Sequence, residues 1–333
     1  MPARLDDLGA HAGGMLWALA FRDGRAHPGD EEDLTAAPSA PDAWTWAHFP
    51  LGDVRARAFI ARMQTLPAGF QELIESDDQR LQFAGDGVWA YGVLPDLERD
   101  LAGEPRGAGR LFFALDDRLM ITARVHALRV VDDVRREAEQ GLRLERPADA
   151  AAALVDHYTE LLDLRLDQLT VQLAAVEDLV LSEPSDVDGL RLGPLRRELA
   201  RHRRELQALR GALARGRLAR NGRSPGPLLH DLERLAAPIG DLDREAGDLQ
   251  ERARLLHEEI DTLITSATNR GIRTLTVIST LLIPPTLVVG AFGMNVRGIP
   301  FAGSRAGFAI AVLICVALVT AALLLLRRLK LLP

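Results

Sequence analysis

The tripeptide Gly293-Met294-Asn295 holds the groups in this sequence that are best suited to binding a cation. It closes an apolar run that begins near Ile272, and a second apolar run starts near Gly307 after a short turn. Two apolar segments joined in this way are typical of a hairpin that enters and leaves a bilayer. The triplet would lie at the tip of that hairpin, where it predicts an ion mouth.

Helix chemistry gives the same prediction. The carboxyl end of a helix has unpaired carbonyls and roughly half a negative charge. With the Asn295 amide oxygen and the Gly293 carbonyl, such ends offer oxygen ligands to a hydrated divalent cation, and glycine permits the backbone to turn there. Oxygen ligands suit magnesium, which keeps its water, whereas zinc favours imidazole and thiolate.

Catalytic motifs are not apparent elsewhere. The sequence has no nucleophile elbow, no Walker-type loop and no histidine pair at zinc-finger or zincin spacing. Acidic pairs such as Asp77-Asp78 and Asp132-Asp133 are typical of solvated surface. The eight histidines are scattered along the chain: His11, His27, His48, His126, His157, His202, His230 and His257. We expect no enzyme activity and no bound cofactor.

The two apolar runs are long enough to span a bilayer. Residues 272–293 and 307–326 provide 22 and 20 positions without an interior charge, against the roughly 20 that a spanning helix needs. Burial of both runs in a soluble core is the alternative. An outer loop of residues 294–306 joins them, and residues 327–333 form a basic tail. Pro284-Pro285 predicts a kink in the first run, near Thr280.

The basic residues that flank the runs predict their orientation. Five lie on one side and two on the other, which by the positive-inside rule puts both termini in the cytoplasm. The larger group is Arg270, Arg273, Arg327, Arg328 and Lys330, and the smaller group is Arg297 and Arg305.

Charge is divided unevenly along the chain. All 47 acidic residues lie at or before Asp261, and seven of the 40 basic residues follow it, so residues 1–261 carry a net charge of about −14. An acidic soluble part excludes nucleic acid as a partner and favours cations. The single cysteine, Cys315, lies in the second apolar run, so one chain can form neither a disulfide nor a thiolate metal cage.

Residues 146–271 read as a helical bundle and stalk. A heptad stripe predicts one long helix from about residue 231 to Phe292. The stripe comprises Leu228, Leu232, Leu235, Ile239, Leu242, Ala246, Leu249, Ala253, Leu256, Ile260 and Leu263. A helix through residues 158–180 ends at Ser182, and another begins near Gly193-Pro194 and ends at the Asn221-Gly222 turn. His202 lies in a gap of the latter's stripe, as a packing residue or a ligand.

Residues 1–145 read as a cytosolic α/β domain. Short β-rich runs occur at 15–21, 43–49, 87–94 and 111–124, and the last has Asp116-Asp117 at a hairpin turn. Helical patterns occur at 54–64 and 131–140, and residues 28–41 and 103–109 look like loops. The fold class is therefore an α+β membrane protein: an amino-terminal α/β domain, a long helical stalk and two carboxyl-terminal transmembrane helices.

The stretch from Asn269 to Asn295, NRGIRTLTVISTLLIPPTLVVGAFGMN, resembles the signature of the CorA family of divalent-cation transport proteins. That family has an asparagine at the start of the pore helix, a proline at its middle and the same terminal triplet. The outer loop, with Gly298-Ile299-Pro300, is more similar to the ZntB zinc-transporting branch. The resemblance is specific over residues 265–300 and diffuse over most of the remaining chain.

The resemblance implies a homopentameric funnel in a bacterial inner membrane. The partners of each chain would be further copies of the same chain, divalent cations and membrane lipid. It assigns the pore face to six residues that share one side of the first membrane helix. These are Asn269, Ile272, Thr276, Thr280, Ile283 and Leu287, and the mouth is Gly293, Met294 and Asn295. The threonines would hydrogen-bond the water around an ion, while the aliphatic residues would narrow the path. Threonine as packing glue between membrane helices is the alternative.

Three functions remain open from the sequence. The first is a zinc-preferring transporter, with proton coupling unresolved, and the second is a magnesium, cobalt or nickel channel of the same fold. The third is a cytosolic scaffold that the hairpin merely anchors. Arg297 and Arg305 make the outer loop basic, unlike a loop that concentrates cations. Because no Asp, Glu or His follows Asp261, any proton carrier must lie in the soluble part or be no side chain of the membrane segments.

Overall fold

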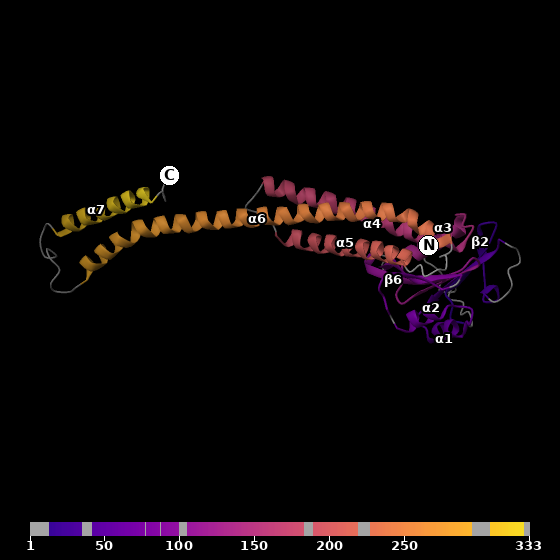
Figure 1. Ribbon diagram of the computed structural model, residues 1–333. Helices are drawn as coiled ribbons and strands as arrows, with labels where there is room; N and C mark the ends of the chain where they lie inside the picture. Colours follow the sequence, from indigo (N-terminus) through magenta and orange to yellow (C-terminus); the bar gives the residue numbers. More distant parts are fainter. Residues whose placement is uncertain are drawn as a thin grey trace. The chain divides into compact units, whose positions relative to one another are not determined.

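The computed structural model describes residues 13–34, 42–76, 78–86, 88–99, 105–182, 189–218, 227–294 and 307–329 (Figure 1). The chain divides into two compact units. The first comprises Met1–Ala175 with Leu190–Arg254, and the second comprises Val176–Gly189 with Leu255–Pro333.

One mixed sheet forms the centre of the amino-terminal soluble α/β domain. Its seven strands are β1 (Trp17–Arg22), β2 (Arg25–Pro28), β3 (Trp44–Pro50), β4 (Gln82–Asp86), β5 (Trp89–Arg99), β6 (Pro105–Leu115) and β7 (Leu119–Arg124). Their order is β2-β1-β3-β7-β6-β5-β4, and only the β3–β7 pair is parallel. A parallel pair needs a long crossover, and the whole segment from α1 to β6 supplies it.

Aspartates shape the turns and helix ends around this sheet. Asp116 accepts hydrogen bonds from the amides of Arg118 and Leu119, both at 2.8 Å, which confirms the predicted β6–β7 hairpin. Asp53 accepts the Arg55 amide at 2.8 Å and caps α1 (Val54–Arg62). This arrangement is a typical N-cap.

Asp96 ties the sheet to a helix. Its buried carboxylate, on β5, accepts the amides of Val130 at 2.8 Å and Val131 at 3.1 Å, at the start of α3 (Val130–Gln140). These are N–H groups that a helix cannot pair internally, so a strand residue serves as the cap. The helix ends at Gly141, whose positive φ of 117° is the left-handed conformation that glycine adopts without strain.

His48 lies fully buried in the sheet, with Trp17 directly opposite on β1 and Thr122 directly opposite on β7. The His48 Nδ1 atom lies 2.9 Å from the Thr122 hydroxyl, which also accepts a 2.9 Å hydrogen bond from Trp46. The His48 ring stacks on Trp17, with ring centroids 5.0 Å apart. Burial, followed by the charges of Arg124 and Arg135, holds the pKa of His48 well below its usual value.

Three long helices carry the stripes that the sequence predicts: α4 (Pro147–Ser182), α5 (Gly189–Leu218) and α6 (Pro227–Gly293). In the first unit, the stripe residues of α6 from Ile239 to Ala253 are buried. His202 is also buried within the α5 stripe, and its Nε2 atom lies 3.5 Å from a carboxylate oxygen of Glu198. Leu228, Leu232 and Leu235 belong to the α6 helix, but their side chains lie outside the described residues.

Several predicted boundaries are wrong. The second helix begins at Gly189, so Pro194 lies inside α5, near enough to its start that few backbone hydrogen bonds are lost. Strand β6 begins at Pro105, where a loop through Gly109 was expected, because pairing with β5 extends it. Strands β2 and β4 and helix α2 (Ala68–Glu75) were not predicted, since each is too short for a clear period.

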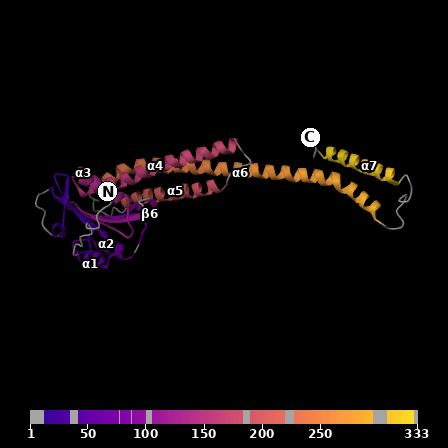
Figure 2. The same cartoon turned by 180° about the vertical axis from the view of Figure 1, so that it is seen from behind.

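The second unit contains the predicted apolar hairpin. Helix α6 continues without a break to Gly293, and α7 runs over Gly307–Arg328 (Figure 2). Both are long and apolar enough to cross a membrane. The prediction of one long helix is confirmed, with a start at Pro227 rather than at residue 231. The Asn221-Gly222 turn and residues 295–306 of the outer loop lie outside the described residues.

The low pKa of His48 predicts acid destabilisation of the sheet. The unfolded chain binds a proton near the usual histidine pKa, whereas the folded chain does not, so stability falls as the pH drops below about 6.5. The His48 contribution to this loss should approach about 1.4 kcal/mol per pH unit. The buried Asp96, whose pKa is raised to about 7, contributes in the opposite direction over the same range. Tryptophan fluorescence during urea unfolding reports on this sheet, because all four tryptophans lie in β1, β3 and β5.

The control is His48→Gln, whose amide can still hydrogen-bond to Thr122 but does not titrate. Its unfolding midpoint should change less between pH 7 and pH 5. An equally steep pH dependence in this variant would contradict the assignment to His48.

Candidate functional site

The predicted pore residues form one stripe along α6 in the second unit. At about 3.6 residues per turn, successive members fall on the same side of the helix. The stripe comprises Asn269, Ile272, Thr276, Thr280, Ile283 and Leu287. Ile272, Ile283 and Leu287 are 58%, 64% and 74% exposed in the single chain. Apolar side chains this exposed need a further surface or lipid to cover them.

Helix α7 contacts a different side of α6 from the stripe. Pro285, two residues from both Ile283 and Leu287, lies about half a turn from the stripe, and its carbonyl is 3.9 Å from the Cys315 sulfur. Residues on this side are half-buried: Val277, Leu281, Pro285, Val288 and Phe292. The hairpin therefore covers one side of α6 and leaves the stripe open.

The two stripe threonines direct their hydroxyl hydrogens inward. Thr276 donates to the Ile272 carbonyl at 2.8 Å, and Thr280 donates to the Thr276 carbonyl at 2.7 Å. Each hydroxyl oxygen then retains only acceptor capacity toward the outside. An acceptor matches water bound to a cation, because such water points its hydrogens outward. The same bonding leaves the threonines without an exposed donor for packing against another helix.

Two shallow hollows follow the stripe and share Ile283. One is lined by Thr276, Thr280 and Pro284, among others, and the next includes Leu287 and Met294. Gly290 also lines the second hollow. It follows Leu287 by three residues, which places it on the stripe, although it was not among the predicted pore residues. The spacing alone could have identified it.

The mouth is described only in part. Gly293 ends α6 and Met294 is 59% exposed, whereas Asn295 lies outside the described residues. The chain bends at Met294, and Gly293 does not adopt a positive φ. It is the last helical residue, so helix geometry still governs its backbone. The carboxyl end of the helix dipole remains at this point.

The stripe offers oxygen and hydrocarbon but no charged ligand. No Asp or Glu follows Asp261 in the sequence, and the described residues contain no cluster of three His, Cys, Asp or Glu that could hold a metal ion. A cation beside this surface would therefore keep its water. The arrangement can guide a hydrated ion but cannot strip it.

A sequence model described as CorA-like Mg²⁺ transporter protein matches residues 41–328 of the chain. The match includes most of the soluble domain, all of the described stalk and both apolar helices. The chain belongs to the CorA family. Membership makes it a divalent cation transporter and confirms the family that residues 269–295 predicted.

Individual relatives agree with this assignment. The chain is 28% identical over 296 residues to the divalent cation transporter CmaX of Pseudomonas aeruginosa, covering 87% of this chain and 88% of the relative. It is 24% identical over 299 residues to the zinc transport protein ZntB of an Enterobacter species, with 88% of each covered. The solved structure of full-length CmaX superposes with a TM-score of 0.80 at 25% identity, covering 96% of this chain and 98% of that one. The predicted fold class is therefore confirmed.

The sidedness of α6 predicts a pattern of thiol labelling. In a Cys315→Ser background, single cysteines at Thr276 and Leu287 should react with a water-soluble methanethiosulfonate in proteoliposomes. Cysteines at the next residues, Val277 and Val288, should stay largely unlabelled, because they face α7 and a thiolate forms only where water reaches. Intact-protein mass spectrometry measures the labelled fraction. Equal labelling at neighbouring positions would refute a water-lined stripe.

Proposed function

We propose that five copies of this chain surround a central pore, through which divalent cations cross the membrane. The observation that carries the proposal is the open stripe of α6. Its side toward Pro285 is covered by α7, while Ile283 and Leu287 remain 64% and 74% exposed. A ring of such helices would cover the stripes with one another and leave a narrow path between them.

The path would act on a hydrated ion in stages. Asn269 lies at the inner end, and the acceptor oxygens of Thr276 and Thr280 follow it. Ile283 and Leu287 then form an apolar constriction that can lose its water and close the path. Gly293, Met294 and Asn295 form the outer mouth, where five helix ends add their partial negative charges. Both termini lie in the cytoplasm, consistent with the basic residues that flank the hairpin.

Zinc is the proposed preferred substrate. Relatives at 24–28% identity include proteins named as zinc transporters, and the Gly298-Ile299-Pro300 element of the outer loop resembles theirs. A magnesium, cobalt or nickel channel is the second candidate. It is favoured by the stripe itself, which has neither imidazole nor thiolate and suits an ion that keeps its water.

Removal of the stripe oxygens should slow transport. A Thr276→Val, Thr280→Val variant keeps the side-chain shape but loses two acceptors, each worth about 0.5–1.5 kcal/mol. Flux into proteoliposomes should fall by about tenfold. Thr274→Val is the matched control, because Thr274 makes the same bond to a carbonyl four residues back but lies off the stripe. Asn295→Ala should abolish flux while the protein still assembles; unchanged flux in this variant would remove Asn295 from the proposed mouth.

Direct competition between ions separates the two transporter proposals. Zinc and magnesium uptake would be measured in the same proteoliposomes, with and without a pH gradient. The zinc proposal expects faster zinc uptake, and proton coupling expects that uptake to respond to the gradient. Faster magnesium uptake, insensitive to pH, would identify the second candidate instead.

A further inference from the structure

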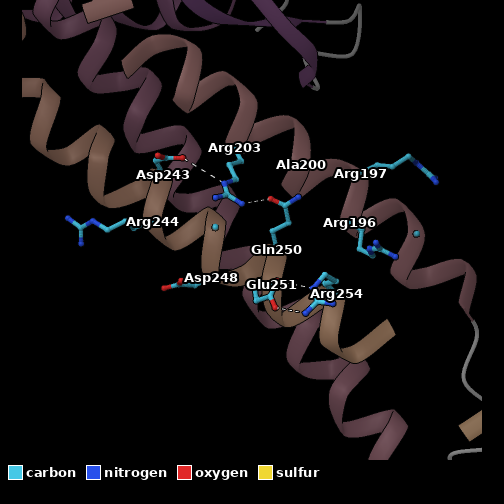
Figure 3. A pocket seen from close by; sticks show the side chains of 12 residues that line it. Arg196, Arg197, Ala200, Arg203, Asp243, Arg244, Asp248, Gln250, Glu251 and Arg254 are labelled. Carbon is cyan, nitrogen blue, oxygen red and sulfur yellow. Dashed lines mark hydrogen bonds and ion pairs between the residues drawn. The ribbon is translucent and has the colours of Figure 1, made fainter. Parts of the chain in front are cut away.

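A hollow between α5 and α6 in the first unit is lined mainly by charged residues (Figure 3). It measures about 820 Å³, which is room for several side chains. Its lining includes Arg196, Arg197, Arg203, Arg244 and Arg254 against Asp243, Asp248 and Glu251. An excess of arginine in a soluble part that is acidic overall requires an explanation.

Neutralisation within the chain is incomplete. Arg254 pairs with Glu251 at 2.7 Å, and Arg244 pairs with Asp241. Asp243 must serve both Arg203, 4.0 Å away, and Arg210, 3.4 Å away. The Nε atom of Arg203 is buried without a hydrogen-bond partner in the described part of the chain.

Two arginines at the hollow have no ion pair among the described residues. These are Arg196 and Arg197 on α5, whose guanidinium groups are drawn away from the acids of α6 (Figure 3). Residues seven positions apart lie on the same side of a helix, and Arg203, Arg204 and Arg210 follow Arg196 and Arg197 at this spacing on α5. We call this the arginine flank: Arg196, Arg197, Arg203, Arg204 and Arg210.

The opposite charge gathers on α4. Asp156, Glu160, Asp163 and Asp167 follow at steps of four, three and four, so all four carboxylates share one face, and all are exposed. Glu245 of α6 lies close enough that Asp163 and Asp167 affect it: burial first, then these two charges, raises its pKa. None of the five pairs with an arginine or lysine within the described ranges. We call this set the acidic flank.

The two flanks lie on different sides of α6. At about 3.6 residues per turn, Glu245 lies on one side of the buried stripe formed by Leu242, Ala246 and Leu249. Residues that line the arginine hollow, such as Gly247 and Gln250, lie on the other side. Helices α4, α5 and α6 run alongside one another in both views, and Arg165 of α4 pairs with Glu198 of α5 at 2.7 Å (Figures 1 and 2). A single chain therefore cannot bring its own flanks together.

We propose that the arginine flank of one copy docks on the acidic flank of the next copy, and that this contact closes the ring. A cyclic assembly uses two different surfaces on opposite sides of each subunit, as these flanks are. Exposed ion pairs add little affinity, but complementary charge selects the partner and its register, while like charges facing each other are costly. The inference rests on the proposed ring and assigns its soluble interface.

A charge swap in the full chain tests the contact. Arg196→Glu with Arg197→Glu, and separately Asp163→Arg with Asp167→Arg, should each raise the subunit concentration at which the detergent-solubilised oligomer dissociates by about tenfold or more. The four changes together should restore it, since the reversed flanks are complementary again. Light scattering and native mass spectrometry measure the oligomer, and high salt should weaken the wild-type contact.

The matched control is Arg22→Glu with Arg25→Glu, which makes the same change in net charge at exposed positions of β1 and β2. It should leave assembly unchanged, and tryptophan fluorescence should confirm that every variant folds. Failure of the fourfold variant to reassemble would overturn the proposal, as would normal assembly of both double variants. Saturable binding of pyrophosphate to the arginine-lined hollow of the wild-type protein, with no change in its oligomeric state, would also overturn the proposal, because the arginines would then serve as an anion site. If the wild-type protein is itself monomeric, the proposed pore is wrong. If the wild-type protein transports cations as an oligomer but the charge swaps do not alter its assembly, only the assignment of the flanks is wrong.

Discussion

The continuity of α6 as one helix, which persists through Pro238, Pro284 and Pro285, is the constraint on which the other features depend. A segment that crosses a membrane must satisfy its backbone groups internally, so helix is the conformation open to it. Because α6 runs from Pro227 to Gly293, one periodicity sets which residues are buried in the first unit and which are open in the second. Thr276 and Thr280 obey the same constraint, since their hydroxyls bond to carbonyls of the helix and expose only acceptor oxygen.

The distribution of charged residues along the chain is a second constraint. The apolar helices carry no carboxylate, so a cation beside their described residues meets only uncharged oxygen. Acidic residues are concentrated in the soluble part, where α4 sets four of them on one face. That soluble surface also has an arginine flank, so net charge alone does not describe it. In the proposed ring, the acidic residues of α4 would both attract cations and contact the next subunit.

The soluble domain depends on polar groups placed inside a sheet. Asp96 supplies from a strand the cap that α3 lacks locally, and His48 sits between cross-strand neighbours with a lowered pKa. Buried polar groups of this kind are costly unless paired, and they favour one arrangement of strands over others. The lowered pKa of His48 makes the sheet sensitive to acid, whereas burial raises the pKa of Asp96 to about 7, so that its contribution to stability is lost as the pH rises.

Periodicity in the sequence was sufficient to predict the long helix and the stripes, and continuous hydrophobicity was sufficient for the two apolar helices, because each signal is local and repeats many times. The hairpin at Asp116 was predicted from a local turn signal, the Asp116-Asp117 pair between two apolar runs. Periodicity also placed Thr276, Thr280 and Leu287 on one side of a helix. Only the tertiary structure decided which side α7 covers, since the contact of Cys315 with Pro285 joins residues distant in sequence. The short strands β2 and β4, the early start of β6 and the Asp96 cap depended likewise on pairing with distant residues. The separation of the arginine and acidic flanks became visible only when three helices were packed around a common core.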